Sequence, residues 1–363
     1  MPKQIKNVFY QSLTFSKFID AHNRSKKNKM FKNEVLLFDL NLETNIVSLI
    51  DSIKDNTYKI GNYHSFRVYE PKERIIQSLP YRDRVVHQWY VEEFIKPYIL
   101  PKFIYSSFAC LPNKGIHKAT QYVQNMMRKY QKKYPDYYIL KCDIRKYFNS
   151  INPDILFKIL NRYISDKALL QFTKKLIFEN RPFNTPQGIP IGNYTSQYFA
   201  NIYLNELDQY VKRTLHIHEY VRYMDDFIIL QKDKTSCINL MQVISRFLKT
   251  SLNLELNHKS KYYPNKMGVN FCGYRIFSTH KLLRNSSKKK IKRHVKKWNK
   301  SYKANSLDFD KTMLRLNSWL GHSSHSNSYN LQQKILAKCD FLLNDKAYDK
   351  FEKNILDDLS NLS

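Results

Sequence analysis

The stretch Glu219–Gln231 reads EYVRYMDDFIILQ and places two adjacent carboxylates between two runs of strand-forming residues. The runs Tyr220–Met224 and Phe227–Leu230 are rich in β-branched and aromatic side chains, which favour strands. An acidic pair between two such runs predicts a hairpin whose tip carries Asp225 and Asp226. Two like charges side by side destabilise a fold unless a cation neutralises them. The pair therefore indicates either a divalent-metal site or an ordinary polar turn.

A third carboxylate follows a second predicted strand. The segment Tyr137–Ile151 reads YYILKCDIRKYFNSI, and Asp143 comes shortly after its apolar run Tyr138–Leu140. A strand-terminal Asp together with a hairpin Asp pair is the ligand set that two-metal phosphoryl transfer needs. This combination favours the metal site over two structural turns. The predicted catalytic residues are Asp143, Asp225 and Asp226. The predicted ligands of two Mg²⁺ ions are Asp143, Ile144, Asp225 and Asp226.

Both segments resemble the catalytic motifs of reverse transcriptases. Between them lies Gly188–Asp208, GIPIGNYTSQYFANIYLNELD, in which Ile191–Gln197 reads IGNYTSQ. Most reverse transcriptases have Gln where this chain has its first Ile, and Pro where it has Gln. The variant is similar to reverse transcriptases of diversity-generating retroelements, which are group II intron-like bacterial enzymes. The resemblance continues through Gly268–Arg284 and Ser318–Leu331, so it covers nearly the whole chain.

The resemblance implies an α+β fold with the right-hand polymerase architecture of fingers, palm and helical thumb. It divides the chain into an N-terminal helical extension (residues 1–60), fingers and palm (61–280) and a basic thumb with the C-terminal segment (281–363). The implied activity is error-prone RNA-directed DNA synthesis from dNTPs on an RNA template, with a small basic accessory protein as partner. The implied location is the cytoplasm, for a bacterial or phage-encoded protein. Two alternatives remain: an antiphage-defence reverse transcriptase with protein-primed or untemplated synthesis, and a non-enzymatic, maturase-like RNA-binding factor.

Nucleotide contacts follow from the same resemblance. Ser65–Tyr69 and Arg74–Ser78 read as the arms of a hairpin whose cations would cover the triphosphate. Phe148 matches a steric gate, because its ring would collide with a ribose 2′-OH. Ile191 replaces an amide near the templating base pair, which implies misincorporation opposite adenine; the alternative is a buried strand residue. Lys259 matches a lysine near the leaving pyrophosphate, or is a plain surface lysine. The predicted nucleotide-binding residues are Lys72, Arg74, Arg82, Phe148, Ile191, Gly192, Gln197 and Lys259.

A basic stretch near the C-terminal end predicts a nucleic-acid-binding helix. Residues 281–307 hold many basic side chains and no acidic one, with Ile291, Val295 and Trp298 at helical spacing. This pattern indicates a thumb helix with its apolar stripe inward and its cations toward phosphates. His322 and His325 lie three residues apart; packing or RNA contact is favoured there over a metal clip. The predicted primer- and template-binding residues are Gly273, Tyr274, Lys288, Lys292, Arg293 and Lys296.

Composition agrees with a polyanionic partner. The 363 residues hold 61 Lys and Arg against 31 Asp and Glu, a formal charge of +30. Nucleic acid is favoured over an acidic membrane, because the basic residues do not lie opposite a long apolar helix face. Five scattered cysteines without a CxxC pair indicate reduced thiols. The sequence has no apolar run long enough to cross a bilayer and no signal-peptide pattern, so we expect a cytosolic protein.

Overall fold

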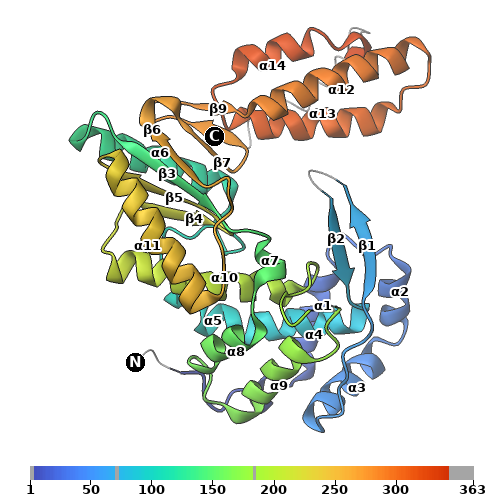
Figure 1. Cartoon of the computed structure of the whole chain (residues 1–363). Helices are drawn as coiled ribbons and strands as arrows, with labels where there is room; N and C mark the ends of the chain where they lie inside the picture. The colour runs from blue at the N-terminus through green and yellow to red at the C-terminus, as the bar shows by residue number, and fades with distance from the viewer. Residues whose placement is uncertain (1–3, 70–72, 183–184, 343–363) are drawn as a thin grey trace. The chain divides into compact units, whose positions relative to one another are not determined.

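The computed structural model describes residues 4–69, 73–182 and 185–342. The chain divides into two compact units (Figure 1). The first unit holds the residues up to Ala119 together with Tyr138–Tyr263; the second holds Thr120–Tyr137 and the residues from Pro264 onward. The boundaries expected from sequence, at residues 60 and 280, differ from the boundaries of these two units. The expected boundaries separate functional parts of a polymerase, whereas the units are defined by compactness.

The first unit combines ten α-helices with two sheets in its described residues. In chain order they are α1 (Phe15–Lys26), α2 (Asn33–Leu40), α3 (Leu42–Lys54), β1 (His64–Val68), β2 (Arg74–Ser78), α4 (Tyr81–Tyr90), α5 (Lys96–Tyr98), β3 (Tyr138–Asp143), α7 (Tyr147–Ser150), α8 (Pro153–Asn161), α9 (Lys167–Phe178), α10 (Tyr194–Gln209), β4 (Tyr220–Tyr223), β5 (Asp226–Gln231), α11 (Lys234–Leu252) and β6 (Lys261–Pro264), the last of which crosses the unit boundary. The expected helix over residues 41–54 and the expected hairpin over residues 65–78 are thus confirmed.

The N-terminal helices belong to the core of the first unit. Phe9 packs edge-on against Trp89, with ring centroids 6.0 Å apart, and both rings contact Phe172 of α9. The Trp89 indole Nε1 donates to the carbonyl of Ser12 at 3.0 Å. Large aromatic side chains contribute much of the energy of such a core. Residues 4–60 therefore fold together with the fingers and palm elements.

A four-stranded sheet carries the acidic segments. Its strand order is β4-β5-β3-β6, and β5 runs antiparallel to both β4 and β3. The strand interiors are apolar because α11 packs against β3 and β5 (Figure 1). Ile139, Leu140 and Phe227 are fully buried there. Burial pins the register of these strands, because a slip of one residue would turn every apolar side chain toward water.

The second unit contains a three-stranded sheet and a helical bundle. Its elements are α6 (Ile116–Lys133, for most of its length), β7 (Val269–Phe271), β8 (Tyr274–Ile276), β9 (Lys281–Leu283), α12 (Asn285–Lys303), α13 (Phe309–Ser324) and α14 (Tyr329–Leu336). The apolar stripe predicted for the basic helix is confirmed: Ile291, Val295 and Trp298 of α12 are buried in a core with residues of α13 and α14. The cations between them face solvent.

None of the helices in the described part of the chain is both long enough and apolar enough to cross a lipid bilayer.

Candidate active site

The hairpin tip differs by one residue from the sequence-based expectation. Tyr223, the last residue of β4, pairs with Asp226, the first residue of β5. The two-residue turn is therefore Met224-Asp225, and Asp226 is a strand residue. Met224 has a φ of 54°, a conformation that residues other than glycine adopt at a cost. This turn projects Asp225 beyond the ladder.

Asp143 and Asp225 come together at the end of the sheet. Asp143 ends β3 opposite Asp226, so it lies next to the turn. Burial, followed by the negative charge of Asp143, raises the pKa of Asp225 to about 6. The cations of Arg74 and Arg222 oppose this rise. The sequence-based expectation that Asp143 meets the hairpin tip is confirmed, although 82 positions separate the two aspartates in the chain.

The segment after α11 holds Asp143 in place. The Asn257 side-chain amide donates to Asp143 Oδ2 at 3.0 Å, and the Asn257 backbone N–H donates to the Asp143 carbonyl at 2.7 Å. The Asp143 N–H donates in turn to Ser260 Oγ at 3.2 Å. Neither Asn257 nor Ser260 is marked as a functional residue by its own sequence context. The only local signal was their position on either side of the candidate Lys259, which itself is exposed.

Asp226 is engaged differently from the other two carboxylates. Its Oδ2 accepts from the Lys141 ammonium at 3.0 Å. Within the described residues, no group of three or more His, Cys, Asp or Glu side chains is arranged to hold a metal ion. Asp226 nevertheless lies directly across the ladder from Asp143, and its assignment as a catalytic residue and metal ligand stays a prediction.

The neighbouring carboxylates of Asp143 and Asp225 fit a magnesium ion. Mg²⁺ is commonly held by one or two carboxylates completed by water and substrate phosphates, rather than by a full protein cage. The mutual repulsion of Asp143 and Asp225 is what a divalent cation would relieve. Ile144 forms an isolated bridge with Leu256, flanked by the Arg145 and Asn257 N–H bonds to that segment. The Ile144 carbonyl consequently points away from Leu256, and its assignment as a ligand stays a prediction.

The basic residues predicted near the triphosphate lie in different surroundings. Arg74 in β2 is exposed and near enough to Asp225 to lower its pKa. Arg82 is exposed in the first turn of α4, and its guanidinium lies over the Tyr58 ring at 5.2 Å from the centroid. Lys72 lies outside the described residues. Of the predicted triphosphate-binding cations in the described residues, Arg74 is thus the one whose charge acts on Asp225.

A backbone contact joins the fingers hairpin to the Ile191 segment. The Gln77 N–H in β2 donates to the Ile191 carbonyl at 2.8 Å. Gly192 follows with a φ of 145°, and a Cβ there would lie 2.3 Å from the Gln77 carbonyl oxygen, so only glycine fits. Ile191 itself is half-buried, and Gln197 is exposed on α10. Phe148 is half-buried with its ring edge-on to Tyr147 at 5.8 Å.

In the second unit, the turn between β7 and β8 is anchored to α13. Cys272 and Gly273 both have positive φ, 46° and 91°. Beside them the Tyr274 hydroxyl donates to the His322 carbonyl at 2.7 Å and lies 3.0 Å from its Nδ1. Burial, with a smaller contribution from His325, lowers the pKa of His322. His322 thus packs against Tyr274, with ring centroids 4.6 Å apart, and the preference for packing or RNA contact over a metal clip stays a prediction.

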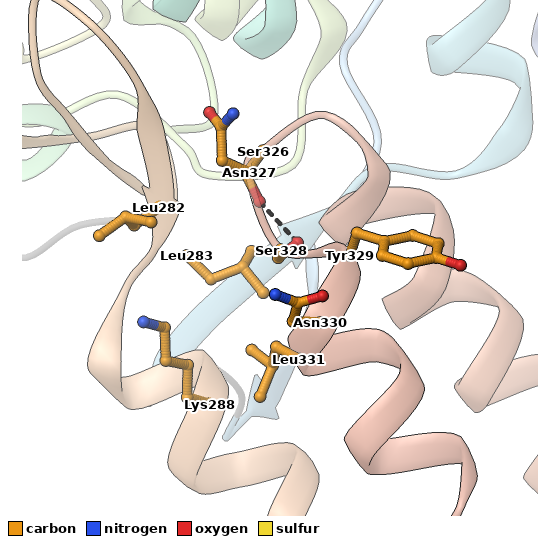
Figure 2. Close-up of a pocket in the computed structure, with 9 residues that line it drawn as sticks. All are labelled: Leu282, Leu283, Lys288, Ser326, Asn327, Ser328, Tyr329, Asn330 and Leu331. Carbon is orange, nitrogen blue, oxygen red and sulfur yellow. Dashed lines mark hydrogen bonds between the residues drawn. The ribbon is translucent and has the colours of Figure 1, made fainter.

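Of the predicted primer and template residues on α12, Lys292, Arg293 and Lys296 are exposed and Lys288 is half-buried. Lys288 borders a pocket of about 590 Å³ that is also lined by β9 and by the segment entering α14 (Figure 2). The Ser326 and Ser328 hydroxyls are hydrogen bonded at its edge. The helix α12 therefore buries its apolar stripe in the core of the second unit and exposes these cations to solvent.

Comparison with known proteins defines the class to which this fold and site belong. The family model "Reverse transcriptase (RNA-dependent DNA polymerase)" matches residues 67–276, which is more than half of the chain. The match contains β2, Asp143, the Ile191 segment and the acidic hairpin. The chain belongs to the reverse transcriptase family, and its mixture of helices and sheets has the right-hand polymerase architecture.

Within that family the chain is similar to group II intron-encoded proteins. It is 23% identical to the group II intron-encoded protein LtrA of Lactococcus lactis subsp. cremoris, over 64% of this chain and 50% of the relative. It is 24% identical to the putative COX1/OXI3 intron 2 protein of Saccharomyces cerevisiae, over 70% and 37%. It is 26% identical to protein YkfC of Escherichia coli K12, over 58% and 66%. The chain therefore spans between about a third and two thirds of the length of these relatives.

Solved structures of telomerases align with part of the chain. Apo telomerase from Candida tropicalis aligns with a TM-score of 0.45 at 14% identity, covering 64% of this chain and 59% of its own. Telomerase from Candida albicans, in complex with a fragment of telomeric RNA, aligns with a TM-score of 0.46 at 11% identity, covering 67% and 51%. The family assignment rests on the sequence match and not on these alignments.

Proposed function

We propose that this protein is an RNA-directed DNA polymerase that extends a primer by metal-assisted nucleotidyl transfer. The observation that carries the proposal is the closeness of Asp143 and Asp225 at the end of the sheet, inside the segment that matches the reverse transcriptase family. Two partly buried carboxylates that repel each other cost stability, which a protein tolerates where function needs them. A polar turn without a function would not need this arrangement.

The chain's own residues divide the work by position. Asp143 and Asp225 would hold Mg²⁺. When bound, Mg²⁺ would activate the primer hydroxyl and neutralise negative charge on the α-phosphate. Asn257 and Ser260 orient Asp143, and Arg74 brings positive charge to the triphosphate side of the pair. Positioning and electrostatics account for most of the catalysis in such reactions, so no nucleophilic side chain is required.

Primer extension tests this function directly. A DNA primer annealed to an RNA template should be extended with dNTPs and Mg²⁺, and Asp225→Asn should abolish extension. Asp233→Asn is the matched control, because Asp233 caps α11 and Asn caps a helix nearly as well. Wild-type protein that binds the RNA but never extends the primer would support the non-enzymatic alternative instead.

We further propose that the synthesis is error-prone, as in diversity-generating retroelements. The support is Ile191, whose apolar side chain stands where most family members have an amide, and whose carbonyl is bonded to the fingers hairpin through Gln77. A template RNA would bind the basic face of α12, and the resemblance adds a small basic accessory protein as partner. Extension without a template, or from a protein primer, would favour the antiphage-defence alternative.

A further inference from the structure

A fully buried ion pair lies behind the acidic turn. The Arg222 guanidinium of β4 donates from Nε and Nη2 to the two carboxylate oxygens of Asp208, at 2.7 and 2.6 Å. Both side chains are 0% exposed, and the Tyr220 hydroxyl also donates to Asp208 at 2.6 Å. Because desolvation of both charges offsets most of their attraction, a buried ion pair is a poor source of stability. Its presence calls for another role.

The third guanidinium nitrogen reaches the turn itself. Arg222 Nη1 donates to the Met224 carbonyl at 3.0 Å and to Asn201 Oδ1 at 3.0 Å. Met224 is the positive-φ residue immediately before Asp225. One planar group with several fixed donors thus connects α10 to the backbone that presents Asp225. Asn201 and Asp208 lie two turns apart on α10 and so share a face of that helix.

The opposite side of Arg222 is fixed as well. Its backbone N–H donates to the Ser106 carbonyl and its carbonyl accepts from the Phe108 N–H, both at 3.0 Å. Asn201 reaches the same segment, because its side-chain amide donates to the Ala109 carbonyl at 2.8 Å. Both the backbone and the guanidinium of Arg222 are therefore fixed by hydrogen bonds, and the contact of the guanidinium with the Met224 carbonyl restrains the turn.

We propose that Arg222 is a positioning residue: clamped by Asp208 and Asn201, it fixes the Met224 carbonyl and so aims the Asp225 carboxylate for metal binding. This inference rests on the polymerase function proposed above. It predicts that a lysine cannot replace Arg222, because an ammonium lacks the planar fork that binds Asp208 in two places while it reaches Met224. It also predicts that charge alone at this position is not sufficient.

The decisive variant removes the buried ionic cluster without leaving unpaired charge. Asp208→Leu, Tyr220→Phe and Arg222→Met are combined, because apolar replacement of a complete buried ion pair is often neutral or stabilising. Urea unfolding verifies that the triple variant folds. Mn²⁺ affinity, measured by electron paramagnetic resonance without nucleotide, and kcat for primer extension should each fall by about 10- to 100-fold, the range for groups that orient metal ligands. KM for dNTP should stay within about twofold of wild type.

Two further variants keep the test decisive. Arg222→Lys preserves the charge, and should also lose Mn²⁺ affinity if the fork is what matters. Tyr90→Phe is the stability control: it removes the buried Tyr90–Thr173 hydrogen bond at 2.7 Å, away from the turn, and should leave Mn²⁺ affinity unchanged. If the triple variant fails to fold, Arg222→Lys carries the test.

Two results would overturn the inference: a folded triple variant, or Arg222→Lys, with wild-type Mn²⁺ affinity and kcat. Absence of extension by the wild type would instead count against the polymerase function, and the Mn²⁺ comparison would still decide the role of Arg222.

Discussion

Replacing Asp225 by Asn should stabilise the metal-free protein. The pKa of Asp225 rises from an ordinary 3.8 to about 6, first through burial and then through the charge of Asp143. The folded state therefore holds this proton more tightly than the unfolded state. Stability consequently falls as pH rises from about 4 to about 6, and the full cost is present above that window. The rise corresponds to about 3 kcal/mol. Asp225→Asn removes the charge while keeping the shape, so its gain at pH 8 should approach that figure.

The assay is urea unfolding in EDTA at pH 8 and at pH 4, with hydrogen exchange of the β4–β5 peptide reporting on the first unit. The gain from Asp225→Asn should be present at pH 8 and nearly absent at pH 4, where the carboxyl is protonated when folded. Mg²⁺ at a hundred times its dissociation constant should stabilise the wild type by about 2.7 kcal/mol and the variant much less. Asp233→Asn should change stability little at either pH. A metal-free Asp225→Asn protein that is less stable than wild type at pH 8 would refute the reasoning.

Three other perturbations follow from the site and the thumb. Ile191→Gln should lower misincorporation opposite template adenine by about tenfold, the worth of one hydrogen bond, while extension continues; sequencing of products checks this, and an unchanged error spectrum removes Ile191 from the fidelity argument. Phe148→Ala should raise ribonucleotide incorporation by roughly 10- to 200-fold, as expected for a site that selects by shape; equal discrimination in competition assays would contradict the steric gate. Replacing Lys292, Arg293 and Lys296 by Gln should weaken RNA binding and reduce the slope of log affinity against log salt by roughly 2 to 3; an unchanged slope would mean that these cations do not meet phosphates.

Local patterns were sufficient for the elements. The apolar spacing of residues 42–53 predicted α3, and the two runs around the acidic pair predicted β4 and β5, because helices and strands repeat their buried positions with different periods. The same spacing placed Ile291, Val295 and Trp298 on the inner face of α12. The local pattern was less informative at the turn: the residue that shares the tip with Asp225 is Met224 and not Asp226.

The contacts that hold the site could not be predicted in this way. Asn257 meets Asp143 from a position 114 residues further along the chain, and Lys141 meets Asp226 across 85 residues. Nothing in the spacing of such pairs marks them, because strand pairing and helix packing decide which distant residues become neighbours. The packing of the N-terminal segment could not be predicted either: residues 1–60 look like an extension in sequence, whereas apolar side chains between Ile5 and Ile60 are buried in one core with Trp89 and Phe172.

The amino-acid sequence by itself determined the chemistry available to this protein: three aspartates at strand ends, a basic helix and an apolar residue in place of an amide at position 191. Only the tertiary structure decided the surroundings of the aspartates, since it brings Asp143 close to Asp225, places Lys141 beside Asp226 and places Arg222 behind the turn. Side-chain type is a property of each residue, whereas repulsion, burial and orientation are properties of neighbours, and neighbours exist only once the chain has folded.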